Sequence, residues 1–120
     1  MNVMVTYGGN ASQYPKEEPM LDTIFAELPR AYVTDTFTTP TSFYFVIDAT
    51  RRTVVCDREH CSVSDGKTLE NVDCVCKTSE ALFLRIWQEG YLPGMGDFLK
   101  GAIKSTAPHL LPQFLKAFGK

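Results

Sequence analysis

The sequence has no long hydrophobic run. No apolar stretch approaches the roughly 20 residues that a membrane-spanning helix needs. The first residues lack the charged-then-apolar order of a signal peptide. The closing Phe118-Gly119-Lys120 matches neither a peroxisomal nor an ER-retention signal. We therefore expect a cytoplasmic location.

Groups that carry chemistry are also scarce. The two histidines, His60 and His109, stand in no Ser/His/Asp, Cys/His or His-Glu-x-x-His arrangement. Gly94-x-Gly96 is too short for a phosphate-binding loop and follows no predicted strand. The sequence therefore predicts a protein that is not an enzyme and holds no cofactor.

Cysteine is limited to four residues, Cys56, Cys61, Cys74 and Cys76. Their spacings, C-x4-C and C-x-C, differ from the C-x2-C pairs of common zinc modules, and all fall in strand-like segments. Without an export signal, reduced thiols are expected. Three alternatives remain open: buried free thiols, a cross-strand Cys56–Cys61 disulfide, or a redox or metal module in which several thiols share one sheet face.

The composition is that of an ordinary globular domain. A chain of 120 residues with 44% hydrophobic and 22% charged residues can bury a real core within one domain. Its net charge of −2 does not indicate nucleic-acid binding. Cations nevertheless outnumber anions after residue 76, where they are Lys77, Arg85, Lys100, Lys104, Lys116 and Lys120. This excess fits either a solvated face or an end that approaches anionic surfaces.

The chain divides into a short tail and a single domain. Residues 1–17 are polar and irregular, and the alternation of Val3, Val5 and Tyr7 allows an edge strand or a tail. The domain covers residues 18–120. A helix is predicted near 19–28, where Pro19 suits a first turn and Pro29 should disturb or end the helix.

Five strands are predicted, at 43–47, 52–56, 60–64, 72–76 and 102–105. A two-residue loop at Arg58-Glu59 would make a hairpin of the second and third strands. In that register Cys56 faces Cys61 and Val54 faces Val63.

Three further helical segments follow the fourth strand. Thr78 is the expected N-cap of a helix over 79–89, and Gly90 is its expected C-cap. A turn with a short helix is predicted over 92–98, and a closing helix from about Pro108–Pro112 onward.

Several short motifs in the last third of the chain occur in a characteristic order. They are Val72-Asp73 before an alternating strand, Thr78-Ser79-Glu80 with Phe83-Leu84, Gly90-Tyr91-Leu92-Pro93, and Phe98-Leu99-Lys100-Gly101-Ala102-Ile103-Lys104. This order resembles the sterol-carrier-protein family, the non-specific lipid-transfer domains. The likeness covers residues 42–118 and, more loosely, the first helix.

The resemblance implies an α+β fold in which a five-stranded, mostly antiparallel sheet is covered on one face by helices and encloses an apolar cavity. The cavity would hold a fatty acid, a fatty acyl-CoA or a sterol- or isoprenoid-like lipid. The lining candidates, which an ordinary core would equally bury, are Phe83, Ile86, Trp87, Tyr91, Leu92, Met95, Phe98, Leu99, Phe114 and Phe118.

The sequence leaves two alternatives open. An accessory domain that presents substrate to a separate partner enzyme would look the same in sequence. The closing helix, with an apolar face of Leu110, Leu111, Phe114, Leu115 and Phe118, is either a lid over the cavity or a permanent part of the core. As a lid it would let the nearby lysines contact an anionic membrane surface.

Overall fold

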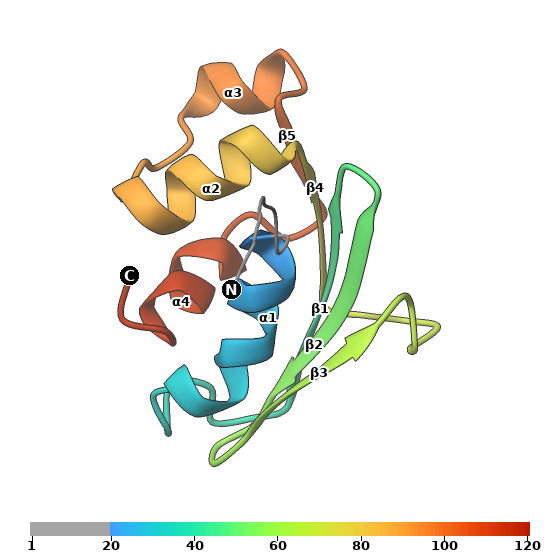
Figure 1. The fold of residues 1–120 in the computed structure, drawn as a ribbon, viewed down its shortest axis with the longest axis vertical. Coiled ribbons are helices and arrows are strands. Elements are labelled where there is room, and N and C mark those ends of the chain that lie inside the picture. Colours follow the sequence, from blue (N-terminus) through green and yellow to red (C-terminus); the bar gives the residue numbers. More distant parts are fainter. Residues whose placement is uncertain (1–19) are drawn as a thin grey trace, which may run out of the picture.

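A computed structural model describes residues 20–120 of the chain (Figure 1). The predicted N-terminal tail or edge strand and the Pro19 helix start lie outside the described residues. The elements are α1 (Met20–Ala31), β1 (Thr41–Ile47), β2 (Thr50–Cys56), β3 (Cys61–Asp65), β4 (Cys74–Thr78), α2 (Glu80–Glu89), α3 (Met95–Leu99), β5 (Ile103–Ser105) and α4 (Leu110–Lys116).

The five strands form one sheet in the order β3-β2-β1-β4-β5. All neighbouring pairs are antiparallel except β1 and β4, which run parallel at the centre. The predicted mostly antiparallel α+β fold is therefore confirmed. The hairpin register is confirmed as well, since Cys56 pairs with Cys61 and Val54 with Val63.

The helices cover one face of the sheet, which we call the inner face (Figure 1). Along β1 every second side chain is buried, so Phe43, Phe45 and Ile47 point to the helices. Four side chains of α1 meet this face, namely Leu21, Ile24, Phe25 and Leu28. The core thus lies between the sheet and a single layer of helices.

Two features of the helices differ from the predictions. Helix α1 continues past Pro29, but only to Ala31. Because Pro29 lies in the last turn, the lost hydrogen bond and the clash of its ring with the preceding turn affect only the end of the helix. Thr78 is not the N-cap of α2: it ends β4 and its hydroxyl donates to the Ala102 carbonyl at 3.0 Å. The N-cap is Ser79, which accepts from the Leu82 amide at 3.1 Å.

The fourth strand is shifted along the chain relative to its prediction. It begins at Cys74 rather than Val72, because Asp73 instead uses its carboxylate to accept from the amide and hydroxyl of Ser42. The alternation is preserved, so Cys74 and Cys76 keep their predicted shared face. Over residues 20–120, none of the helices is both long and apolar enough to span a bilayer.

Candidate ligand-binding site

A small apolar cavity lies between the inner face of the sheet and the helices α2 and α4. Its free volume is about 50 Å³, and no polar surface lines it. The lining residues are Phe45, Cys76, Thr78, Phe83, Ile86, Pro93, Ile103, Leu111, Phe114 and Leu115. One water molecule takes about 30 Å³ of liquid, whereas pockets for drug-sized ligands span about 300–1,000 Å³. In this closed form the cavity is too small for a lipid chain.

The strand register explains the floor of the cavity. Phe45 pairs with Cys76 across the parallel β1–β4 ladder, and Thr78 pairs with Ile103 across β4–β5. Paired residues project to the same side of a sheet, so these side chains form one continuous surface. The Thr78 hydroxyl is satisfied by Ala102, which leaves only carbon and sulfur to face the cavity.

Aromatic rings fill most of the space around the cavity. Phe114 of α4 is the centre of this cluster, with its ring centroid 4.9 Å from Phe43, 5.0 Å from Phe45 and 4.9 Å from Phe118. Phe83 and Trp87 stack on α2 at 5.8 Å. These contacts hold α2 and α4 against the sheet and explain why so little free volume is left.

A surface groove adjoins the cavity along the seam between α2 and α4. It has a volume of about 370 Å³ and is lined by Ile86, Gly90, Leu92, Pro112, Leu115, Lys116 and Lys120. Ile86 and Leu115 line both the groove and the cavity. These two side chains therefore lie between the cavity and the groove. The Lys120 ammonium lies 4.9 Å from the centre of the Trp87 ring, a cation–π contact at one end of the groove.

The predicted lining residues separate into three groups. Phe83, Ile86 and Phe114 line the cavity, and Trp87 and Phe118 are buried directly behind them. Tyr91 and Phe98 are half-buried against the edge of the core. Exposed side chains make up the third group: Leu92 at 68%, Met95 at 78% and Leu99 at 80%. Of these three, Leu92 lines the adjoining groove.

The structure also brings in residues that sequence reasoning missed. From the sheet they are Phe45, Cys76, Thr78 and Ile103, and from the helical layer Pro93, Leu111 and Leu115. The period-two alternation of the strands would have found Phe45 and Cys76, because both stand at buried alternate positions of β1 and β4. No sequence signal distinguishes Leu111 and Leu115 from their apolar neighbours on α4.

The four thiols all lie on the inner face. Cys74 pairs with Phe43 and Cys76 with Phe45, while Cys56 lies opposite Cys61. All four are buried and free, which is the first of the three alternatives for the cysteines. Burial raises the pKa of Cys76 to about 12. A hydrogen bond to Cys61, together with burial, raises the pKa of Cys56. Within residues 20–120, no cluster of three or more potential metal ligands occurs.

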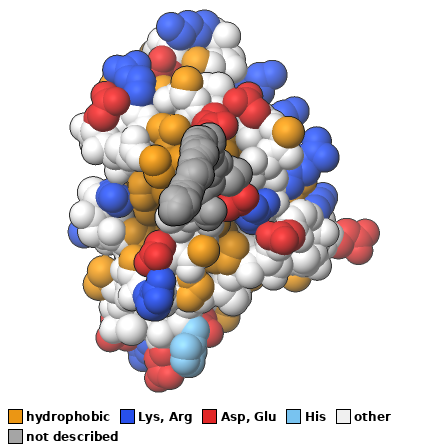
Figure 2. All heavy atoms as spheres, in the orientation of Figure 1, with side chains coloured by type: hydrophobic (Ala, Val, Ile, Leu, Met, Phe, Trp, Pro, Cys, Tyr) orange, Lys and Arg blue, Asp and Glu red, His pale blue; other side chains and the backbone are white. Residues whose placement is uncertain are grey.

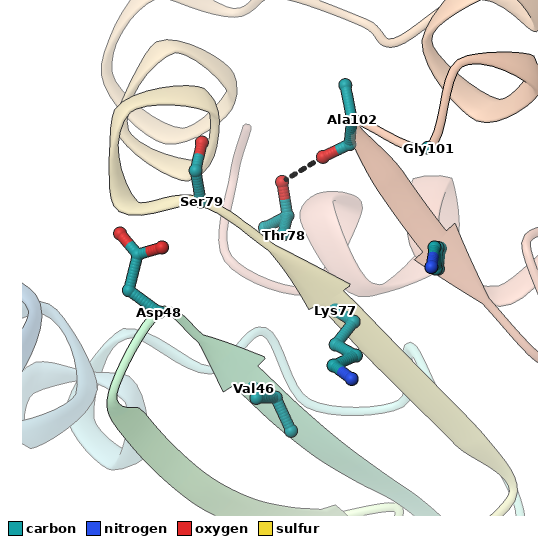
Figure 3. Close-up of a pocket in the computed structure, with 8 residues that line it drawn as sticks. Val46, Asp48, Lys77, Thr78, Ser79, Gly101 and Ala102 are labelled. Carbon is teal, nitrogen blue, oxygen red and sulfur yellow. Dashed lines mark hydrogen bonds between the residues drawn. The ribbon is translucent and has the colours of Figure 1, made fainter.

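A second, polar hollow lies on the opposite face of the sheet, near the start of α2 (Figure 3). Asp48 and Ser79 flank it, and Lys77 and Lys104 are exposed partners in the β4–β5 register. The Asp48 carboxylate accepts from the Glu80 amide at 2.9 Å, so its role is to cap α2. Val46 and Ala102 line the hollow together with these polar and charged residues, and we assign no ligand to it.

Helix α3 is held firmly although it exposes apolar side chains. The Tyr91 hydroxyl donates to the Asp97 carboxylate at 2.5 Å, and the same carboxylate accepts from the Gly94 amide at 3.0 Å. The Arg85 guanidinium lies 4.1 Å from the centre of the Tyr91 ring. Tyr91 and the Gly94 amide together lower the pKa of Asp97. Met95 and Leu99 therefore project from a helix whose start is held in place by these hydrogen bonds.

No protein-family model matches the sequence, and no curated protein matches it. Solved structures do match it. A protein described as UbiJ-SCP2, a ubiquinone synthesis protein, superposes with a TM-score of 0.59 at 10% identity, over 84% of this chain and 93% of that one. The chain has an SCP2-like fold. The sterol-carrier-like fold expected from the sequence motifs is thereby confirmed.

The SCP2-like fold also occurs as a small part of a larger enzyme. The inverting sec-alkylsulfatase Pisa1 from Pseudomonas sp. matches with a TM-score of 0.68 at 14% identity. The match covers 85% of this chain but only 17% of the sulfatase. At this level of identity the likeness concerns the fold alone.

Proposed function

We propose that this protein binds, and transfers, an apolar small molecule such as a fatty acid, a fatty acyl-CoA or a sterol- or isoprenoid-like lipid. The observation that carries the proposal is the cavity between α2, α4 and the sheet, which has no polar lining. An SCP2-like fold, with helices over one face of a sheet, supports a container role. The ligand would displace the Ile86 and Leu115 side chains and enlarge the cavity.

The expected affinity is modest. Burial of apolar area contributes about 25 cal/mol per Å², and part of this gain is offset by opening the closed aromatic cluster. We expect a dissociation constant in the micromolar range, which corresponds to about −8 kcal/mol. Native mass spectrometry of protein purified from cells should reveal a co-purifying lipid.

The direct test reduces the cavity volume by enlarging a side chain on the sheet side of the cavity. Cys76→Leu adds carbon atoms to a side chain that lines the cavity, and should weaken the binding of long-chain fatty acids at least tenfold in a Trp87 fluorescence titration. Val75→Leu, one residue away, enlarges a side chain on the other face of the same strand and is the matched control. Equal affinities for both variants and the parent, at comparable melting temperatures, would contradict the proposal.

We further propose that the chain performs no catalytic step of its own. His60 and His109 are both exposed, and burial keeps the Cys76 thiol protonated near neutral pH. We also keep the expectation of a cytoplasmic location, and of transient contact with anionic membranes. The exposed Leu92, Met95 and Leu99 beside Lys100 support membrane contact.

An accessory role toward a separate enzyme is the second candidate. It is favoured by the sulfatase comparison, in which the equivalent fold is a minor part of a catalytic chain. Helix α3, which the Tyr91–Asp97 hydrogen bond holds in place, offers such a partner its exposed apolar side chains. Affinity capture with the parent chain and with Met95→Asp/Leu99→Asp would test this role. Loss of one defined enzyme from the second capture is the expected result.

A further inference from the structure

The groove between α2 and α4 adjoins the apolar cavity. Both spaces are lined by Ile86 and Leu115, so among residues 20–120 these two aliphatic side chains lie at the boundary between them. Such side chains can change rotamer without breaking a hydrogen bond. The seam therefore gives a ligand a direct route from solvent into the space beneath the helices.

The two ends of this route differ in polarity and charge. The cavity has no polar surface, whereas the groove carries Lys116 and Lys120. None of the side chains that line the groove is acidic. Among residues 20–120 neither lysine forms an ion pair. A bound anion would therefore meet two cations that form no ion pair within this part of the chain.

We propose that this route binds a single-chain anionic amphiphile. The anionic headgroup lies in the groove beside Lys116 and Lys120, and the hydrocarbon chain passes between Ile86 and Leu115 into the cavity. This inference rests on the proposed function and deepens it by naming the ligand class and its orientation. A fatty carboxylate and an alkyl sulfate share the required chemistry.

The shape of the route favours a flexible chain over a fused ring system. The closed cavity holds only about 50 Å³, so any ligand must create most of its own space. A linear chain can advance through a gap opened by two side chains. A rigid ring system must move α4 as a whole, against the contacts of Phe114 with Phe43 and Phe45.

The expected contribution of the headgroup is moderate because the groove is open to solvent. Exposed charge pairs are weak individually, so two lysines should together strengthen the binding of an anion by about tenfold over a neutral analogue. Added salt should reduce this preference. The preference for an anion is a property that an apolar container alone would not show.

The test compares three probes of equal chain length: decanoate, decyl sulfate and decan-1-ol, each below its micelle concentration. Binding is measured by calorimetry, because removing Lys120 changes the surroundings of the Trp87 fluorophore. The variant is Lys116→Gln/Lys120→Gln. The matched control is Lys100→Gln/Lys104→Gln, which removes two exposed lysines that do not line the groove.

We expect the groove variant to bind both anions about tenfold more weakly and decan-1-ol within twofold of the parent, while the control binds all three probes as the parent does. A difference between decanoate and decyl sulfate would identify the preferred headgroup. Decan-1-ol binding as tightly as the anions to the parent, or equal losses for all three probes in the groove variant, would overturn the inference but leave apolar binding intact. Failure of all three probes to bind the parent would overturn both.

Discussion

At the scale of single residues, Phe114 has the central position. It is the only α4 side chain that is fully enclosed, at 3% exposure, and its ring meets the two strand aromatics Phe43 and Phe45. It also contacts Phe118 and Trp87. A single ring thus links β1, α2 and the end of the chain, while also forming part of the cavity wall.

Phe114→Ala should lower the free energy of unfolding by about 3–5 kcal/mol, because it removes a buried ring and leaves a cavity. Urea denaturation followed by circular dichroism would measure the change. Leu99→Ala serves as the control: Leu99 is 80% exposed, so the expected change is within about 0.5 kcal/mol. A loss below 1 kcal/mol for Phe114→Ala would show that α4 is not packed as described.

The buried thiols lead to a prediction about pH. Burial raises the pKa of Cys76 from 9.0 to about 12, so the folded state retains this proton at pH values where the unfolded state loses it. The contribution of Cys76 to stability should therefore be complete below pH 9 and decline as pH rises toward 12.

Alkylation with iodoacetamide, followed by mass spectrometry, tests this directly. At pH 8 the native protein should be alkylated at Cys76 at least a hundredfold more slowly than the same protein in urea, because the reaction requires the exposed thiolate. Rapid labelling of Cys76 in the native state would mean that the inner face of the sheet opens readily.

At the scale of elements, α2 is defined by its two ends. Ser79 caps its start, and Asp48 from the end of β1 accepts from the Glu80 amide. Gly90 closes the helix with a φ of 73°, in the left-handed region that suits glycine. These ends orient Phe83, Ile86 and the rest of the apolar stripe toward the cavity.

Gly90→Ala should lower the free energy of unfolding by about 1 kcal/mol. The cost is backbone strain alone, since a Cβ at this position would meet no atom within 4 Å. Gly96→Ala is the matched control, because it is equally unobstructed but lies within α3 and has no positive φ. That change should be neutral or stabilising. Equal effects of the two substitutions in thermal denaturation would refute the capping role of Gly90.

At the scale of the whole molecule, one helical layer and one sheet share a single core. Figure 2 shows several hydrophobic side chains on the face that it presents, with most charged side chains toward its outline. The closing segment from Leu110 is integral to this core, since Phe114, Ala117 and Phe118 are all buried. Backbone hydrogen bonding from Val33 to Ala117, at 2.7 Å, also fixes its end. These observations favour a core helix over a freely opening lid.

Truncation after Thr106 should therefore yield a chain that does not unfold cooperatively. Removal of each buried ring costs about 3–5 kcal/mol, and the losses of Phe114 and Phe118 together approach the total stability of a typical domain, about 5–15 kcal/mol. Circular dichroism and size-exclusion chromatography would report the outcome. A monomeric, cooperatively folding product would restore the interpretation of α4 as a lid.

Local patterns were sufficient to predict much of this fold. The alternation of Phe43, Phe45 and Ile47 identified the inner face of β1, and the Arg58-Glu59 loop fixed the register of the β2–β3 hairpin. Gly90 marked the end of α2. Each of these features depends on side-chain periodicity or backbone conformation within a few residues, and such short-range physics is readable from sequence.

Contacts between residues far apart in the sequence determined the features of the fold that local patterns could not predict. The start of β4 depends on Asp73 binding Ser42, 31 positions away in the chain, and Thr78 is drawn into the sheet by Ala102. The lining of the cavity also depends on contacts between distant residues. The sequence by itself determined that large apolar side chains would gather in the last third of the chain. Only tertiary packing decided that Phe83 and Phe114 face the cavity while Met95 and Leu99 face solvent, because burial depends on which surfaces meet.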